Sequence, residues 1–273
     1  MAKAPAVSWG WNQEPVRIRR EKTRRATSHR IRGATLSVAT AFCGTLGGVS
    51  EFDDATQVRA DGSTEIHAGW DIGGNANGGY LMALAASGLR SVAGRPDPVS
   101  LTAHFLSPGR PGPAVVRGEV VKAGRRFTTV AGNLGAVGAD GEIRTVVQVL
   151  GTFGDLASEV SDIVAMNGAP PELPPWQECI PRESNGIVSV PMIDHLSVRL
   201  HPDHVGWLRG ERIGVAEMAG WFGFADGRPL DTLSLLLVAD ALPRRCSTST
   251  SLLAGFRRWS SPCTCGHYPS QAR

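Results

Sequence analysis

The sequence has no run of about 18 consecutive apolar residues, so it predicts no membrane-spanning helix. Its basic N-terminus is not followed by the apolar stretch of a secretory signal, and we expect a cytoplasmic protein. A nucleic-acid-binding face would need basic residues interleaved with aromatic ones, and the interior of the chain has no such stretch. We therefore expect neither a membrane span nor a nucleic-acid partner.

Cysteines are few and odd in number, five in 273 residues, which argues against a disulfide framework. Cys263, Cys265 and His267 lie close together, as metal ligands would, but no second cysteine pair accompanies them. An accidental cluster is the simpler interpretation, so we expect no metal. The chain also lacks a G-x-S-x-G motif, and nothing else predicts the nucleophile of a serine hydrolase.

Charge is distributed unevenly along the chain, whose net charge is +3. Residues 1–33 hold nine Lys and Arg against two Glu, which gives +7, and residues 243–273 hold five Arg and no acid. The remaining 14 basic and 23 acidic residues give the interior a charge of −9. Because few apolar residues accompany the basic N-terminal segment, we expect residues 1–33 to form a disordered extension rather than a binding element.

The interior opens with a strand-like pattern that leads to an apolar helix. Residues 60–62, ADG, predict a hairpin turn between two strand-like segments, and the second of these leads to Trp70. The segment GGNANGG, residues 73–79, resembles a helix start. Residues 80–89, YLMALAASGL, are helical in composition but apolar on nearly every side. Such a helix must be covered on all sides.

Strands dominate the rest of the first half. Four segments rich in β-branched residues follow the apolar helix: residues 99–109, 114–125, 127–141 and 142–154. No second long helix intervenes, so we expect an antiparallel sheet that curls around the single helix. This is the hotdog arrangement, which we assign to residues 34–156. Five prolines in residues 167–184 then predict an extended linker over residues 157–188.

The same pattern begins again after the linker. HAGW, which ends at Trp70, recurs as MAGW, which ends at Trp221, an offset of 151 residues (221 minus 70). In both copies we expect a strand ending in tryptophan, a glycine-containing loop and an apolar helix. The apolar helix of the second copy is DTLSLLLVADALP. The predicted fold is α+β, a tandem hotdog whose second unit, residues 189–243, is incomplete. Residues 244–273 lose the alternation, so we expect an aberrant tail produced by a shifted reading frame.

Together these motifs resemble the acyl-CoA thioesterases of the double-hotdog, or thioesterase II-like, family. The resemblance is carried by NGGY, SLTAHFLSPGRPGP, EVVKAGRRF and GWFGFADGRPLDTLSLLLVADALP. It implies hydrolysis of a fatty acyl-CoA to free fatty acid and coenzyme A by attack of water. Asp240 matches the family's helix aspartate, which orients and deprotonates that water. No residues match the threonine and glutamine that assist the aspartate, so we expect impaired activity.

Two interpretations are open for each of the candidate catalytic residues, which are Asp240, Asn77, Gly78 and Gly79. In the first interpretation, Asn77 only caps the apolar helix and the glycines only allow a tight turn. In the second, the unpaired N–H groups of the same helix start also stabilise the oxyanion that forms from a thioester. Asp240 is an exposed acid at a helix end or, as the resemblance implies, the group that activates water.

Gly124, Arg125 and Arg126 are candidate substrate-binding residues. We expect them at a turn, where the arginines are either solvated or paired with a phosphate of coenzyme A. No cofactor is expected, since coenzyme A is part of the substrate. The expected partner is therefore acyl-CoA, with a homo-oligomer possible. An inactive acyl-CoA-binding remnant and a hotdog acyl-CoA hydratase or dehydratase are the alternative functions.

Deletion of residues 1–33 should leave the melting temperature nearly unchanged, because a basic segment with few apolar residues cannot bury a core. Calorimetry of the full chain and of the shortened chain measures this directly. A drop of several degrees in the shortened chain would show instead that the segment packs on the rest of the protein.

Overall fold

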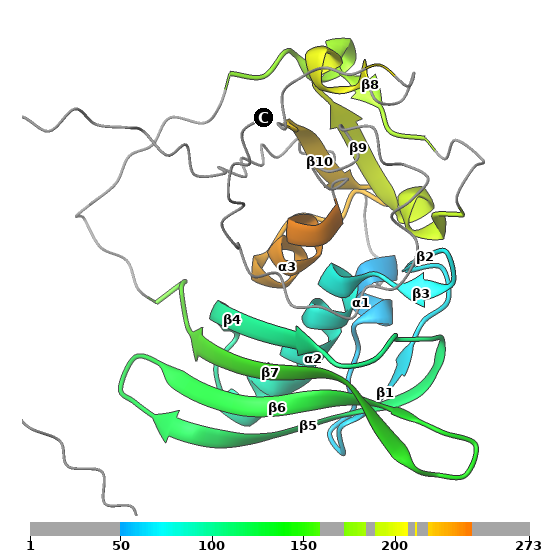
Figure 1. The fold of residues 1–273 in the computed structure, drawn as a ribbon. Coiled ribbons are helices and arrows are strands. Elements are labelled where there is room, and N and C mark those ends of the chain that lie inside the picture. Colours follow the sequence, from blue (N-terminus) through cyan, green and yellow to red (C-terminus); the bar gives the residue numbers. More distant parts are fainter. Residues whose placement is uncertain (1–49, 159–171, 184–188, 207–210, 212–217, 242–273) are drawn as a thin grey trace, which may run out of the picture. The chain divides into compact units, whose positions relative to one another are not determined.

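The structure of the protein, a computed structural model, describes residues 50–158, 172–183, 189–206, 211 and 218–241 (Figure 1). The predicted N-terminal extension and the predicted aberrant tail lie outside these residues, as do parts of the predicted linker. The described residues form a five-stranded sheet, a three-stranded sheet, a two-stranded hairpin and three α-helices.

A short helix, α1 (Glu51–Ala55), precedes the first strand, β1 (Ser63–Ile66). The predicted strand before the turn at residues 60–62 is therefore wrong, although the turn itself is present. The Ser50 hydroxyl caps α1 by accepting a hydrogen bond from the Asp53 N–H at 3.0 Å. Three acidic residues in the first turn add to this, because the helix dipole favours negative charge there.

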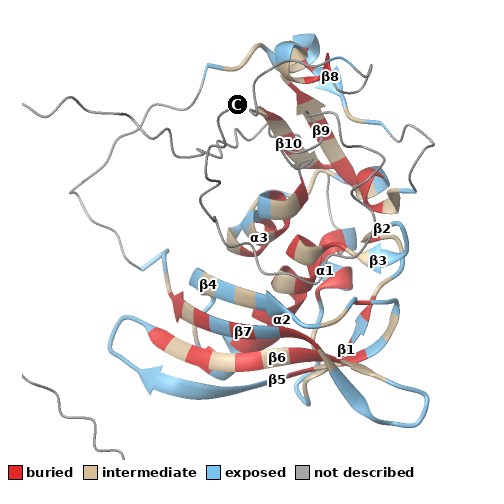
Figure 2. Cartoon of the chain, viewed as in Figure 1, coloured by how far each residue is buried: buried red, intermediate tan, exposed pale blue. Residues whose placement is uncertain are grey.

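Helix α2 (Gly78–Ala93) is the predicted apolar helix. The Asn77 side chain caps its first turn by accepting a hydrogen bond from the Tyr80 N–H at 3.0 Å, and Gly94 ends it in the left-handed conformation at φ 62°. Within residues 80–89 every side chain is buried except Met82, which is half-buried (Figure 2). The prediction of a helix covered on nearly all sides is confirmed.

A five-stranded antiparallel sheet covers α2 and confirms the predicted meander (Figure 1). Its order is β1-β5-β6-β7-β4, so β4 forms one edge. The four long strands are β4 (Asp97–Phe105), β5 (Gly112–Ala123), β6 (Thr128–Val137) and β7 (Ile143–Gly154). A separate hairpin, β2 (Asp71–Ile72) and β3 (Asn75–Ala76), connects β1 to the start of α2.

The second half begins inside the segment that the sequence predicts to be a linker. Strand β8 (Ile180–Pro181) pairs with β9 (Leu196–Leu200), which pairs with β10 (Gly220–Phe224). The Trp221 indole N–H donates to the Pro174 carbonyl at 2.9 Å, and the Arg199 guanidinium donates to the Cys179 carbonyl at 3.0 Å. Residues 174–181 therefore pack on the second sheet instead of running past it.

The two tryptophans of the repeat differ in position. Trp70 lies four residues after the end of β1 and is buried, whereas Trp221 lies inside β10 and is half-buried. The expectation that each copy has a strand ending in tryptophan is therefore wrong. The β2–β3 hairpin accounts for the difference, because it is inserted between Trp70 and α2, while β10 continues to Phe224 before the loop to the next helix.

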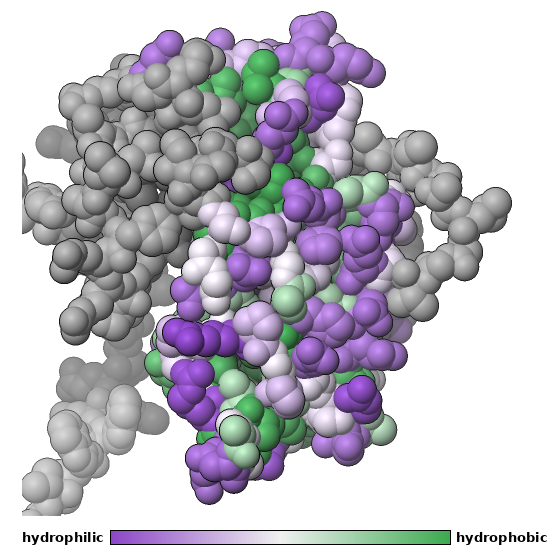
Figure 3. Space-filling view, turned by 90° about the vertical axis from the view of Figure 1, so that its right-hand side faces the viewer, coloured by the Kyte–Doolittle hydropathy of each residue, from purple (hydrophilic) through white to green (hydrophobic). Residues whose placement is uncertain are grey.

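Helix α3 (Thr232–Ala241) packs against α2, and its buried side chains join those of the first half in one hydrophobic core. Leu233, Leu237 and Val238 are buried, but Leu235 is 49% exposed. Burial of the second predicted helix is thus confirmed for one side only. On the side of the molecule drawn in Figure 3, hydrophilic residues cover much of the surface that the described residues form.

An arginine with a largely covered side chain also joins the two halves. Arg228, in the loop before α3, contacts the Asp53 carboxylate at 2.7 Å and the Asp231 carboxylate at 2.8 Å, and its guanidinium lies 5.0 Å from the Phe52 ring centroid. Burial alone would raise the pKa values of Asp53 and Asp231, but hydrogen bonds, those from Arg228 first among them, outweigh it and lower both pKa values. The same pairs raise the pKa of Arg228 against the opposing effect of burial.

Replacing Arg228 with alanine should lower the free energy of unfolding by about 0.5 to 1.5 kcal/mol at neutral pH, because two carboxylates lose their partner but solvent screens both of these half-exposed groups. Both carboxyl groups have folded-state pKa values below the ordinary value of 3.8. Their contribution is therefore present above about pH 4 and is lost as the pH falls through the folded-state values. Urea unfolding at pH 7 and at pH 3 should show a smaller difference from wild type at the lower pH.

Arg59→Ala is the matched control for this experiment, since Arg59 is exposed and its side chain makes no hydrogen bond within the described residues. We expect it to change the free energy of unfolding by less than about 0.5 kcal/mol. Equal losses for Arg228→Ala at both pH values would contradict the assignment of the effect to the ion pairs.

Candidate functional site

The N-terminus of α2 meets the C-terminus of α3, and the Asp240 carboxylate lies between them. Its Oδ2 atom accepts a hydrogen bond from Asn77 Nδ2 at 3.0 Å and a longer one from the Gly79 N–H at 3.3 Å. Asn77 Nδ2 also donates to the Asp240 carbonyl at 3.2 Å. The structure thus brings together three of the four predicted catalytic residues by hydrogen bonds, although they come from different halves of the chain.

Asn77 uses both ends of its side chain at this contact. Its Oδ1 atom accepts from the Tyr80 N–H and so caps α2, while Nδ2 holds Asp240. Its backbone N–H donates to the Trp70 carbonyl at 2.9 Å, and its carbonyl accepts from the Leu81 N–H at 3.0 Å. Asn77 is only 3% exposed, so a polar residue there requires this full set of partners.

Glycine is required at the crossing of the two helices. A Cβ atom on Gly79 would lie 2.6 Å from the Leu236 carbonyl oxygen and 2.9 Å from the Leu237 Cα atom, both on the backbone of α3. A Cβ atom on Gly78, the fourth predicted residue, would lie 2.9 Å from Asp240 Oδ2. The absence of these two side chains lets the α3 backbone approach the first turn of α2.

The dipoles of the two helices act on Asp240 in opposite directions. A carboxylate near the C-terminus of its own helix is unfavourable, which makes an aspartate at the end of α3 a costly choice by itself. The N-terminus of α2 offsets that cost, because it presents a positive partial charge and the Gly79 N–H to the same carboxylate. Asp240 is half-buried rather than fully exposed.

Arg182 supports the end of α3 from the other side. Its Nη1 atom donates to the carbonyl of Ala241, the last residue of the helix, and burial lowers the pKa of its guanidinium. A cation near a helix C-terminus is also favoured by the dipole. Sequence reasoning missed Arg182 because it follows β8 in the predicted linker, and no local signal marks so distant a contact.

Phe105 and the loop after it cover the first turn of α2. The Gly109 carbonyl accepts a hydrogen bond from the Ala76 N–H at 2.9 Å, which ties the loop to the helix start. Phe105 Cζ lies 3.1 Å from the position that a Gly78 Cβ would occupy, on the same side as Asp240 Oδ2. Phe105 and Gly109 both belong to SLTAHFLSPGRPGP, so the motif that carries the family resemblance forms one wall of this site.

Two groups at the site have unused hydrogen-bonding capacity. Among the described residues, no acceptor is bonded to the Gly78 N–H, which points out of the first turn of α2. Likewise, Asp240 Oδ1 has no donor in the part of the chain that the structure describes. A carboxylate oxygen beside a free N–H can bind a water molecule and a carbonyl oxygen at neighbouring positions.

The predicted substrate-binding residues Gly124, Arg125 and Arg126 lie at the turn between β5 and β6. Arg95 holds this turn by donating to the Arg125 carbonyl at 2.7 Å. The strand register places this turn beside Asp97, the first residue of β4. Phe105 is the last residue of the same strand. Eight residues of strand, about 26 Å, separate the two positions. The structure therefore does not bring these three residues to Asp240, and their role in binding phosphate stays a prediction.

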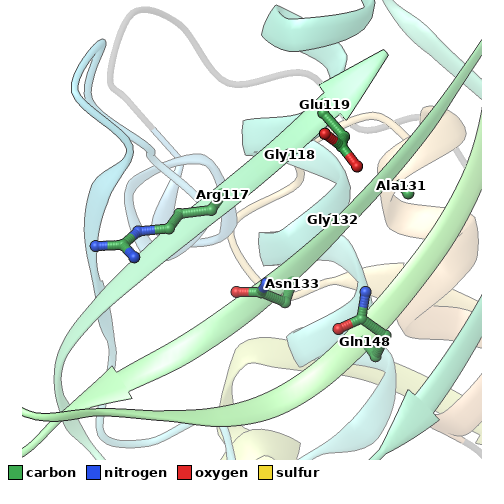
Figure 4. A pocket seen from close by; sticks show the side chains of 7 residues that line it. All are labelled: Arg117, Gly118, Glu119, Ala131, Gly132, Asn133 and Gln148. Carbon is green, nitrogen blue, oxygen red and sulfur yellow. The ribbon is translucent and has the colours of Figure 1, made fainter. Parts of the chain in front are cut away.

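A polar hollow of about 290 Å³ lies on the face of the sheet that points away from α2 (Figure 4). It is lined by Arg117, Gly118, Glu119, Ala131, Gly132, Asn133 and Gln148. The buried Val116 points the other way, since its side chain is close to Gly88 of α2. The hollow is thus separated from Asp240 by the sheet itself.

Two further features are absent from the described residues. They contain no group of three or more His, Cys, Asp or Glu side chains placed to hold a metal ion. They also contain no helix with the length and apolar character needed to cross a membrane. The cluster of Cys263, Cys265 and His267 lies outside them.

Comparison with known proteins places both halves in one family. The sequence profile of the acyl-CoA thioesterase N-terminal domain matches residues 66–154, and the profile of the acyl-CoA thioesterase C-terminal domain matches residues 166–266. The thioesterase-like protein TwmA of Talaromyces wortmannii is 40% identical over 95 residues, which cover 32% of this chain and 27% of that protein. The match thus spans about a quarter of that relative.

Solved structures agree with the fold. A candidate thioesterase II from Thermobifida fusca is 25% identical with a TM-score of 0.65, covering 76% of this chain and 77% of its own. A hot dog fold protein of unknown function from Alicyclobacillus acidocaldarius is 22% identical with a TM-score of 0.60, covering 72% of this chain and 71% of its own. The predicted α+β tandem hotdog is confirmed, and the chain belongs to the acyl-CoA thioesterase family.

Proposed function

We propose that the protein hydrolyses fatty acyl-CoA thioesters and that Asp240 activates the attacking water. One observation carries the proposal: in a chain of the acyl-CoA thioesterase family, a carboxylate is fixed by Asn77 and Gly79 at a helix N-terminus whose first N–H has no acceptor among the described residues. This arrangement supplies a base and an oxyanion donor within one turn of α2.

The proposed reaction needs no covalent intermediate. Water bound to Asp240 Oδ1 loses a proton to the carboxylate as its oxygen attacks the thioester carbonyl carbon. The carbonyl oxygen becomes negative and is stabilised by the Gly78 N–H and the positive end of the α2 dipole. Collapse of this intermediate breaks the C–S bond, and the departing thiolate of coenzyme A takes the proton from Asp240. The products are the free acid and the thiol.

The family resemblance implies a threonine and a glutamine beside the aspartate, and the sequence offers no residues that match them. For this reason we expect slower turnover than in family members that have both. The same feature supports acyl-CoA binding without hydrolysis as the second candidate function. A hydratase or dehydratase with an Asp–His pair is less well supported, because no histidine of the described residues hydrogen-bonds Asp240.

Replacing Asp240 with asparagine should reduce hydrolysis of acyl-CoA by about 10²- to 10⁴-fold, because the amide keeps the shape of the side chain but cannot accept a proton. The release of free thiol from acyl-CoA measures the rate. Asp54→Asn is the control, since Asp54 is an exposed acid of α1. A rate for Asp240→Asn equal to that of the control, with an unchanged circular dichroism spectrum, would exclude Asp240 as the base.

Replacing Gly79 with alanine should destabilise the protein by about 1 to 3 kcal/mol, because the added methyl group collides with the backbone of α3. It should also lower activity, since α3 carries Asp240. Gly223→Ala in β10 is the control, because a Cβ there would meet its nearest neighbour at 3.8 Å, an ordinary contact. Thermal unfolding compares the two variants, and equal melting temperatures would contradict the close helix crossing.

A further inference from the structure

Strand β4 and helix α3 lie side by side and run in the same direction (Figure 1). At their first residues, the Thr232 hydroxyl donates to the Asp97 carboxylate at 2.8 Å. At their other ends, Phe105, the last residue of β4, and Asp240, the next-to-last residue of α3, both approach Gly78. The interval between these two contacts is therefore bounded by one strand and one helix along its whole length.

Apolar side chains from both elements line this interval. On β4, Leu101, Ala103 and Phe105 pair with Gly151, Val149 and Val147 of β7, and the side chains of the two valines are buried on the face toward α2. On α3, Thr232, Leu236 and Asp240 follow one another at four-residue spacing and so form one row. We call these apolar residues of the two facing elements, Leu101, Ala103, Phe105 and Leu236, the apolar track, and Asp240 lies at its end.

The track is partly open. Leu101, Ala103 and Leu236 are half-buried against the core, and Phe105 is 52% exposed. A half-exposed phenylalanine beside a catalytic candidate has apolar surface still to be covered, and its burial by a ligand would be favourable. By contrast, the hollow on the far face of the sheet has four polar side chains in its lining and lies away from Asp240.

We propose that the acyl chain of the substrate lies on this track and that Phe105 selects among acyl chains by their length. The inference rests on the proposed function, which places the thioester carbonyl at the Gly78 N–H. One substituent of that carbonyl is the sulfur of coenzyme A and the other is a hydrocarbon chain. Phe105, one of the described residues nearest to Gly78, is apolar and 52% exposed, so the chain passes over the phenylalanine ring and continues along β4 and α3.

The test compares kcat/KM for decanoyl-CoA and acetyl-CoA in the full chain. Phe105→Ala should lower the decanoyl-to-acetyl ratio by about tenfold to a hundredfold, because a long chain loses the ring surface that an acetyl group does not reach. Phe105→Leu keeps an apolar side chain and should restore most of the ratio. Phe127→Ala is the matched control, since Phe127 is 40% exposed at the opposite end of the sheet, and it should leave the ratio as in wild type.

Three results would overturn the inference while the proposed function stands: an unchanged ratio in Phe105→Ala, an equal loss for both substrates, or the same change in Phe127→Ala. If Phe105→Ala does not fold, Phe105→Trp replaces it in the test. The larger ring leaves less room for a long acyl chain, so the decanoyl-to-acetyl ratio of kcat/KM must fall in this variant. Conversion of a wild-type dimer to a monomer by Phe105→Ala, seen by analytical ultracentrifugation, would show that a second copy covers the track and would also overturn it.

A binding measurement distinguishes failure of the proposed function from failure of the inference about the acyl chain. If wild-type protein releases no thiol from either substrate, calorimetry with non-hydrolysable thioether analogues of decanoyl-CoA and acetyl-CoA replaces the rate assay. Tighter binding of the decanoyl analogue that Phe105→Ala weakens about tenfold or more would support the track without hydrolysis. No preference for the decanoyl analogue in wild type would overturn it.

Discussion

The meeting of two helix ends of opposite partial charge is the interaction on which the site depends. The first turn of α2 has N–H groups without intrahelical acceptors, and the last turn of α3 has carbonyls without intrahelical donors. Asn77 connects these two unsatisfied ends, because its amide both caps α2 and donates to the Asp240 backbone and carboxylate. Asp240 completes the match by offering negative charge to the N-terminus of α2.

An aromatic cluster behind this contact fixes the position of Asn77. The Trp70 carbonyl accepts the Asn77 N–H, and the Trp70 ring stacks on Tyr80 at 5.5 Å and on His195 at 4.5 Å between centroids. Burial raises the pKa of Tyr80, so its hydroxyl stays protonated and donates to the Ala55 carbonyl at 3.0 Å. Since His195 belongs to the second half, both halves of the chain determine where α2 starts.

Local patterns explain which parts could be predicted from the sequence. The apolar run of α2, its Asn77 cap and the β-branched meander are features of neighbouring residues, so composition and periodicity suffice for them. The sequence predicts a strand where α1 forms, because a helix of five residues is too short to show a helical period. Asp240 and Asn77 could each be singled out, but not their contact across 163 residues. No local sequence signal marks Arg182, and Phe105 lies in the motif SLTAHFLSPGRPGP but its position beside Gly78 follows only from the fold.

Because the candidate base and the candidate oxyanion donor come from different halves, the site exists only where α2 and α3 cross. The separation of Asp240 from the Gly78 N–H is set by the absence of a side chain on Gly79, by the Asn77 amide and by Arg182 at the end of α3. The first two of these contacts join residues from different halves, while Arg182 holds the end of α3 from within the second half. A change that weakens the contact between the halves therefore also disturbs the geometry of the site. Neither hotdog unit can be expected to keep the site without the other.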